Sequence, residues 1–188
     1  MKNSTTEAPA TTTPRLPVTR PEGHPAVSPL THETPARLHP RHILAPTDFS
    51  SASKKALAYA VGFAATFDAK VTLIHVIEPM VLPPEYGYLP PYSPEDEARQ
   101  VEAVRKQLLD IAAGWNGVRR SEVMVRVGNP SHEIVGAVSE LEVDLLVITT
   151  HGRTGLRHML MGSVAEKIVR HATCPVLVVR PEERDFID

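Results

Sequence analysis

Apolar residues follow two alternating patterns along the chain. Short runs rich in apolar residues predict strands at residues 43–45, 70–76, 143–148 and 176–179. The run at 143–148 is nearly continuous, as in a strand buried on both faces of a parallel sheet. Residues 122–127 instead alternate polar with apolar side chains, so we expect a strand at the sheet edge, where one face is wetter. Between these runs, apolar residues recur every three or four positions, as on the buried face of a helix.

Each helical segment begins near a residue that can cap it. The predicted caps are Ser50 or Ser51, Ser131 and Ser163, and Ser93-Pro94-Glu95 opens the second helix. In the last of these helices, the apolar positions at helical spacing are Val164, Ala165, Ile168, Val169 and Ala172. Five strands and four helices therefore alternate strictly, which predicts an α/β domain with a single doubly wound, five-stranded parallel sheet and right-handed crossovers.

Composition sets the limits of this domain. Residues 1–40 hold eight of the eighteen prolines, with eight threonines and few large apolar side chains, so we expect a disordered extension there. The folded domain is then expected over residues 41–182, with a short tail at 183–188. A formal charge of −2 gives no electrostatic case for a nucleic acid or membrane partner.

Localisation is predicted from cysteine content and hydropathy. Cys174 is the single cysteine, which rules out an internal disulfide and favours a reducing cytoplasm. Met1-Lys2 precedes polar residues instead of the apolar region of a secretory signal, and no run approaches the ~20 apolar residues of a membrane span. We therefore expect a cytoplasmic protein, in which Cys174 is a small core residue at the start of a strand.

A glycine-rich loop follows the fourth predicted strand. Gly152 and Gly155 flank Arg153, and Gly162-Ser163 then opens the last helix. Glycines bring backbone N–H groups close to a ligand, and a helix N-terminus adds further N–H groups with a partial positive charge. With donors from Arg153 and His151, the loop has the chemistry of a phosphate site. The alternative is a tight surface loop with no ligand.

Asp48 lies just past the first predicted strand, in the turn PTDFS. It can cap the following helix, or it can bind a ribose hydroxyl or orient a metal ion on a phosphate; both roles are compatible. If the strand order is 3-2-1-4-5, strands one and four are neighbours, and Asp48 faces the same crevice as the Gly152 loop. No Walker A loop or dinucleotide fingerprint is present.

Several motifs in order resemble those of the universal stress protein family, over roughly residues 41–181. They are PTDFS, GNPSHEI, THGRTGL and GSVAEKIVRHATCPVLVV. The resemblance implies a Rossmann-like, nucleotide-binding α-hydrolase-type fold, ATP or ADP with Mg²⁺ brought by the nucleotide, and a homodimer paired through residues 176–179. In the family's Gly-x2-Gly-x9-Gly motif, Thr149 stands where the first glycine would be, followed by Gly152 and Gly162.

By the same resemblance, Asp48 would hold the ribose and the Val76 backbone would meet adenine, with Pro46 and Thr47 shaping the sugar end. The residues implied around the phosphates are Thr149, His151, Gly152, Arg153, Gly155, Gly162, Ser163 and Val164. Because no general base for rapid phosphoryl transfer is recognisable, we expect a nucleotide-dependent stress-response switch or adaptor with at most slow ATP hydrolysis. Two alternatives remain, a dimeric interaction module without nucleotide and an adenylate-forming or ATP-pyrophosphatase enzyme.

Overall fold

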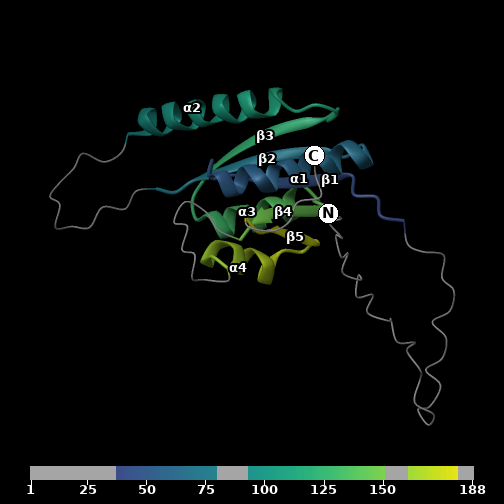
Figure 1. The fold of residues 1–188 in the computed structure, drawn as a ribbon. Coiled ribbons are helices and arrows are strands. Elements are labelled where there is room, and N and C mark those ends of the chain that lie inside the picture. The colour runs from purple at the N-terminus through teal and green to yellow at the C-terminus, as the bar shows by residue number, and fades with distance from the viewer. Residues whose placement is uncertain (1–36, 80–92, 151–160, 182–188) are drawn as a thin grey trace, which may run out of the picture. The chain divides into compact units, whose positions relative to one another are not determined.

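The structure is a computed structural model that describes residues 37–79, 93–150 and 161–181. The chain divides into two compact units, Met1–Arg37 and Leu38–Asp188. The second unit contains all the helices and strands labelled in Figure 1.

Strands and helices alternate along the described chain, as the hydrophobic pattern predicts. Their order is β1 (His42–Pro46), α1 (Ser51–Phe67), β2 (Lys70–Ile77), α2 (Pro94–Ala113), β3 (Ser121–Val127), α3 (Pro130–Glu140), β4 (Leu145–Thr149), α4 (Ser163–His171) and β5 (Val176–Val179). Ser50 and Ser93 cap α1 and α2 by accepting from Ser53 N and Asp96 N, respectively, which confirms the starts expected for these two helices.

The five strands form one parallel sheet in the order β3-β2-β1-β4-β5, which confirms the predicted topology (Figure 1). β1 lies at the centre, with Ile43 opposite Val71 of β2 and Leu145 of β4. β3 pairs only with β2 within the described sheet, at the edge expected from its alternating pattern. The reversal of strand order between β1 and β4 is the switch point at which open α/β sheets bind ligands, beyond the strands' carboxyl ends.

Two hydrophobic cores cover the two faces of the sheet. Helices α1 and α2 pack on one face, where Ile43 and Leu108 are fully buried. Helices α3 and α4 pack on the other, where Leu44 and Leu146 are fully buried and Ile168 nearly so. Alternate residues of β1 thus point into opposite cores, as a central strand requires. Within the described segments, no helix has both the length and the apolar content to cross a membrane.

The start of α3 differs from the prediction, because Asn129 caps this helix instead of Ser131. The Asn129 side chain accepts from the His132 N–H over 3.3 Å and from Ser131 Oγ over 2.7 Å. Pro130 occupies the first helical position and keeps the preceding residue extended, with φ −79° and ψ 122° at Asn129. The cap therefore falls on the residue before the proline.

The predictions for α4 also need correction. Ser163 is its first helical residue, and the N-cap is Gly162, which makes no side-chain cap hydrogen bond. Val164 and Val169 are 39% and 43% exposed, whereas Ala165 and Ile168 are buried. Ala165 and Ile168 lie three positions apart on the face toward the core, whereas Val164 and Val169 are each turned about 100° from a member of this pair.

Strand β4 begins at Leu145, two residues later than the apolar run suggests. Val143 is buried, but its N–H donates to the carbonyl of Val138 and so belongs to the end of α3. Glu142, with φ 50°, makes the left-handed turn between helix and strand. Asp144 then fixes the first residues of β1, because its carboxylate accepts from the backbone N–H groups of Arg41 and His42.

Candidate functional site

The turn after β1 holds Asp48 through a local hydrogen-bond network. Asp48 Oδ1 accepts from the Ser50 N–H over 3.0 Å and from Ser50 Oγ over 2.6 Å. Thr47 is buried, and its Oγ1 accepts from the Phe49 N–H over 3.0 Å and lies 3.1 Å from Ser53 Oγ. Asp48 does not itself cap α1, because Ser50 is the N-cap; instead it makes an Asp-x-Ser turn with that cap residue, and the network holds its carboxylate at the carboxyl end of the central strand.

His75 ties this turn to the neighbouring strand. Its Nδ1 donates to the carbonyl oxygen of Thr47 over 2.7 Å, and its ring lies 4.6 Å from that of Phe49, measured between centroids. Phe49 adopts φ 66°, an unusual conformation for a large side chain. The strain of such a conformation persists only where the surroundings enforce it, so the turn is rigidly supported. Neither this conformation nor this contact could be predicted from the sequence.

The end of β2 extends past the end of β1. The last register pair between the two strands is Pro46 with Ile74, and the Thr47 N–H then donates to the Ile74 carbonyl, on the β1 side. The Ile77 carbonyl accepts from Gly128, on the β3 side. Because backbone groups alternate sides along a strand, those of Val76 point toward the β1 side, beyond the last pair. This is where a base contacting the Val76 backbone would lie.

Thr149 is the last residue of β4, beside β1. Its Oγ1 is buried and has no hydrogen-bond partner among the described residues. A buried hydroxyl without a partner is costly, by roughly 1–3 kcal/mol. The position where the family motif has a glycine therefore carries a buried hydroxyl without a described partner.

The chain leaves β4 at Thr150 and returns to the same place at Gly162. The Gly162 N–H donates to the Thr150 carbonyl over 2.8 Å, and the Thr150 N–H donates to the Val179 carbonyl over 3.2 Å. A Cβ on Gly162 would lie 3.2 Å from the Thr150 oxygen, closer than most Cβ contacts. Only glycine fits this closure without displacing backbone, and the closure places the N-terminus of α4 at the carboxyl edge of the sheet.

The structure thus gathers part of the predicted site at one edge of the sheet. The predicted residues that it places there are Pro46, Thr47, Asp48, Val76, Thr149, Gly162, Ser163 and Val164. The other predicted phosphate residues, His151, Gly152, Arg153 and Gly155, lie outside the described residues. Among those described, no group of three or more His, Cys, Asp or Glu is arranged to hold a metal ion.

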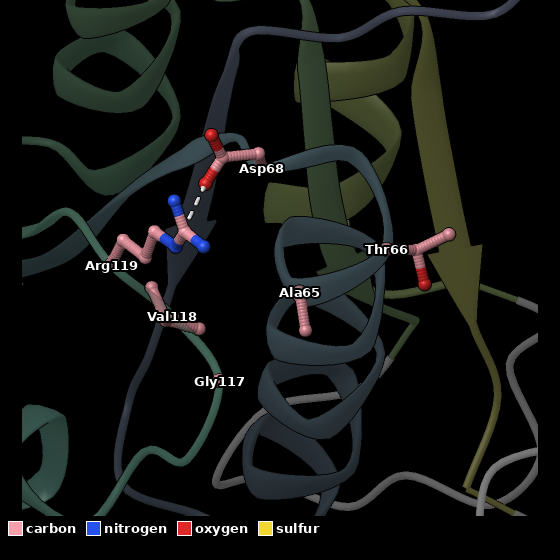
Figure 2. Close-up of a pocket in the computed structure, with 6 residues that line it drawn as sticks. All are labelled: Ala65, Thr66, Asp68, Gly117, Val118 and Arg119. Atoms are coloured by element: carbon pink, nitrogen blue, oxygen red, sulfur yellow. Dashed lines mark ion pairs between the residues drawn. The ribbon is translucent and has the colours of Figure 1, made fainter.

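A pocket of about 580 Å³ lies at the other edge of the sheet, where the strands begin. Figure 2 shows its lining, which comes from the end of α1 and from residues 117–119 before β3. Arg119 Nε and Asp68 Oδ1 are 3.8 Å apart, with side chains 82% and 64% exposed. Such an exposed ion pair contributes little, so the carboxyl edge is the stronger candidate for a binding site.

Cys174 packs, partly buried, against the core beneath α3 and α4. Burial raises the pKa of its thiol above the ordinary value, so little of the reactive thiolate is present at neutral pH. These surroundings support the prediction of a small core residue.

Comparison with known proteins gives one consistent result. The sequence model described as the universal stress protein family matches residues 39–180. Universal stress protein MJ0531 of Methanocaldococcus jannaschii is 37% identical over 147 residues, which cover 77% of this chain and 85% of that protein. Universal stress protein YxiE of Bacillus subtilis is 32% identical over 145 residues, covering 73% and 97%. The solved structure of MJ0577, also from M. jannaschii, has a TM-score of 0.65 at 29% identity and covers 77% and 98%.

Proposed function

The chain belongs to the universal stress protein family, and we propose that it binds ATP or ADP at the carboxyl edge of its sheet. Binding would make it a nucleotide-dependent stress-response switch or adaptor, with at most slow ATP hydrolysis. The observation that carries this proposal is the closure of Gly162 onto Thr150. It brings a helix N-terminus without a side-chain cap to the switch point beside the Asp48 turn, and such an N-terminus favours phosphate.

The described residues suit the successive parts of an adenine nucleotide. Asp48 would accept hydrogen bonds from the ribose hydroxyls, while Pro46 and Thr47 shape the sugar end. The backbone of Val76 would meet the adenine base, on the side of β2 that β1 leaves uncovered. The proposed positions follow the order of neighbouring strands in the sheet: the base lies at β2, the sugar at β1 and the phosphates beyond β4.

The phosphates would lie over the start of α4. The N–H groups of the first turn, including those of Ser163 and Val164, would donate to phosphate oxygens, and the Ser163 hydroxyl would add another donor. Thr149 Oγ1, buried without a described partner, fits a ligand atom at this point. His151, Gly152, Arg153 and Gly155 complete the phosphate site in this proposal.

Binding is proposed in preference to rapid turnover. Fast phosphoryl transfer requires a positioned base or water-orienting group together with metal and cationic stabilisation. In this proposal Asp48 binds Ser50 of its own turn and the sugar, so it does not act as a general base. Mg²⁺ would bind only through the nucleotide phosphates. Nucleotide binding would then change the conformation of the surrounding loop and, through it, a surface that binds a partner.

Two solved universal stress proteins carry nucleotides. One is in complex with cAMP, and another, from Arabidopsis thaliana, has AMP bound; they are 24% and 22% identical to this chain. Likeness at this level shows a shared fold, so the choice of ATP or ADP rests on the phosphate-binding features above. A site without those features would have no reason to prefer a longer phosphate chain.

The proposed partner surface is the edge strand β5. It pairs only with β4 within the described sheet, and Val176, Leu177 and Val178 are only partly buried. An apolar strand edge of this kind is a template for pairing with another chain. We therefore propose a homodimer through Val176–Val179, which would also serve an interaction module that had lost nucleotide binding.

The deciding experiment is to purify the protein without added nucleotide, denature it, and identify any released small molecule by chromatography and mass. Calorimetry with ATP, ADP and Mg²⁺ would follow. Near-stoichiometric ATP or ADP, or binding on titration, supports the proposal. An empty protein that binds neither nucleotide overturns it and favours the interaction module, whereas pyrophosphate release with a second substrate would favour an adenylate-forming enzyme.

A further inference from the structure

An apolar groove separates α1 from the end of α2. It encloses about 460 Å³ and is lined mainly by Leu57 and Val61 of α1, by Ile111 of α2, and by Trp115 just after α2, with Lys54 on its wall. Trp115 and Ile111 are only partly buried against the core. None of these residues belongs to the proposed nucleotide site, so any ligand of the groove would be distinct from the nucleotide.

The chain following β5 is tied to α1, the helix that forms one wall of this groove. Lys55 Nζ donates to the carbonyl oxygen of Pro181 over 3.1 Å. Lys55 and Lys54 are consecutive residues of α1, about 100° apart around the helix axis. The segment that follows Pro181 therefore starts from the helix that forms one wall of the groove.

The chemistry of residues 182–188 complements the groove. Their sequence, EERDFID, places acidic residues around the apolar pair Phe186-Ile187. Lys54 makes no ion pair with any described residue, so its charge is open to a carboxylate. Phe186 is the fifth residue after Pro181, so the intervening chain spans up to about 17 Å, comparable to the path of about 16–19 Å over half the circumference of a helix ~10–12 Å across. Phe186 can thus reach across α1.

We propose that residues 182–188 dock in this groove, with Phe186 and Ile187 against Ile111 and Trp115 and an acidic side chain near Lys54. A short tether gives the segment an effective concentration on the order of millimolar. A segment whose free peptide binds with a Kd of about 1 mM would then occupy the groove about half of the time. The segment would cover an apolar surface that is otherwise partly exposed.

Trp115 is the only tryptophan in the chain, so its fluorescence reports on the groove alone. We would compare the full chain with a variant lacking residues 182–188 and with the double variant Phe186→Ala, Ile187→Ala. Both changes should shift the Trp115 emission to the red. Both should also raise its acrylamide quenching constant about twofold, because a groove occupied roughly half of the time is then always open.

Arg184→Ala serves as the matched control, since it alters the segment but keeps both apolar side chains, and it should leave the emission unchanged. A synthetic peptide of residues 182–188, added at millimolar concentration to the shortened protein, should restore the blue-shifted emission. Unchanged emission and quenching in both variants would overturn the proposal. A quenching constant that depends on protein concentration would also overturn the proposal, because it would mean that a second copy of the chain covers the groove.

Discussion

The backbone N–H of Gly162 lies 2.8 Å from the carbonyl oxygen of Thr150, and a Cβ on Gly162 would lie 3.2 Å from that same oxygen. One contact therefore both closes the connection between β4 and α4 and excludes a side chain from it. The position of the α4 N-terminus, on which the proposed phosphate site depends, is set by this contact.

Gly162→Val should weaken ATP binding about tenfold or more, because the added side chain must push the start of α4 away from Thr150. The overpacking should cost about 1–3 kcal/mol of folding free energy, which leaves a folded protein. Calorimetric titration with ATP and Mg²⁺, with thermal unfolding alongside, measures both effects.

Gly136→Ala is the control for this change. A Cβ there would lie 3.6 Å from Arg126 Nη1, an ordinary contact for a residue within α3. The control should gain about 0.5–1 kcal/mol of stability and should bind ATP normally. If Gly162→Val also bound ATP normally, the phosphates would not lie at the start of α4.

Asp48→Asn and Asp48→Ala together separate the two roles of Asp48. Asparagine keeps an oxygen that accepts from the Ser50 N–H, so the turn should survive with a nearly unchanged melting temperature. Alanine should cost about 1 kcal/mol of folding free energy through the lost hydrogen bonds to Ser50. Both variants should lose about tenfold in nucleotide affinity, because a neutral or absent acceptor cannot match a carboxylate. Full affinity in Asp48→Asn would contradict the ribose role.

His42 joins the start of β1 to two neighbouring segments. Its Nδ1 lies 3.0 Å from the carbonyl oxygen of Leu141, and its Nε2 lies 2.8 Å from Thr72 Oγ1. Burial lowers the pKa of the imidazole, although the hydrogen bond to Leu141 opposes this effect. The folded protein therefore resists protonation of His42 more than the unfolded chain does.

Stability should consequently fall on acidification from about pH 6.5, the ordinary pKa of histidine, through the lowered pKa of the folded state. Above that window the contribution of His42 is fully present. The charged groups near its ring are Lys70, which lowers the pKa further, and Glu122 and Asp144, which raise it. Urea unfolding from pH 8 to pH 5 should show a shallower pH dependence in His42→Gln. It should be unchanged in His132→Gln, whose side chain is 85% exposed in the unaltered protein; equal slopes in all three proteins would refute the assignment.

Periodicity was sufficient to predict the fold because each strand and helix is long enough to show its own pattern. The strand order 3-2-1-4-5 was assumed for a doubly wound sheet, and the structure has it. The alternating run of β3 correctly placed that strand at the sheet edge. These are local patterns repeated over several residues, so single exceptions such as Val143 did not disturb the result.

Features that depend on one contact were less predictable. Asn129 caps α3 because Pro130 follows it, whereas the sequence offered Ser131 as an equally good cap. Phe49 adopts φ 66° beside His75, and nothing local to Phe49 signals that conformation. The Gly162 closure likewise joins residues twelve positions apart, so only the folded chain reveals why glycine is required there.

Thr149→Val tests whether a ligand satisfies the buried hydroxyl at the end of β4. Valine has nearly the same shape but lacks Oγ1, the atom without a described partner. In nucleotide-free protein, Thr149→Val should raise the free energy of unfolding by about 1–2 kcal/mol, because a polar atom without a partner is no longer buried. Affinity for ATP should fall about fivefold to tenfold in the same variant, whereas Thr149→Ser should keep it. Chemical denaturation and calorimetry measure the two quantities. A stability gain without a loss of affinity would mean that the hydroxyl faces no part of the nucleotide.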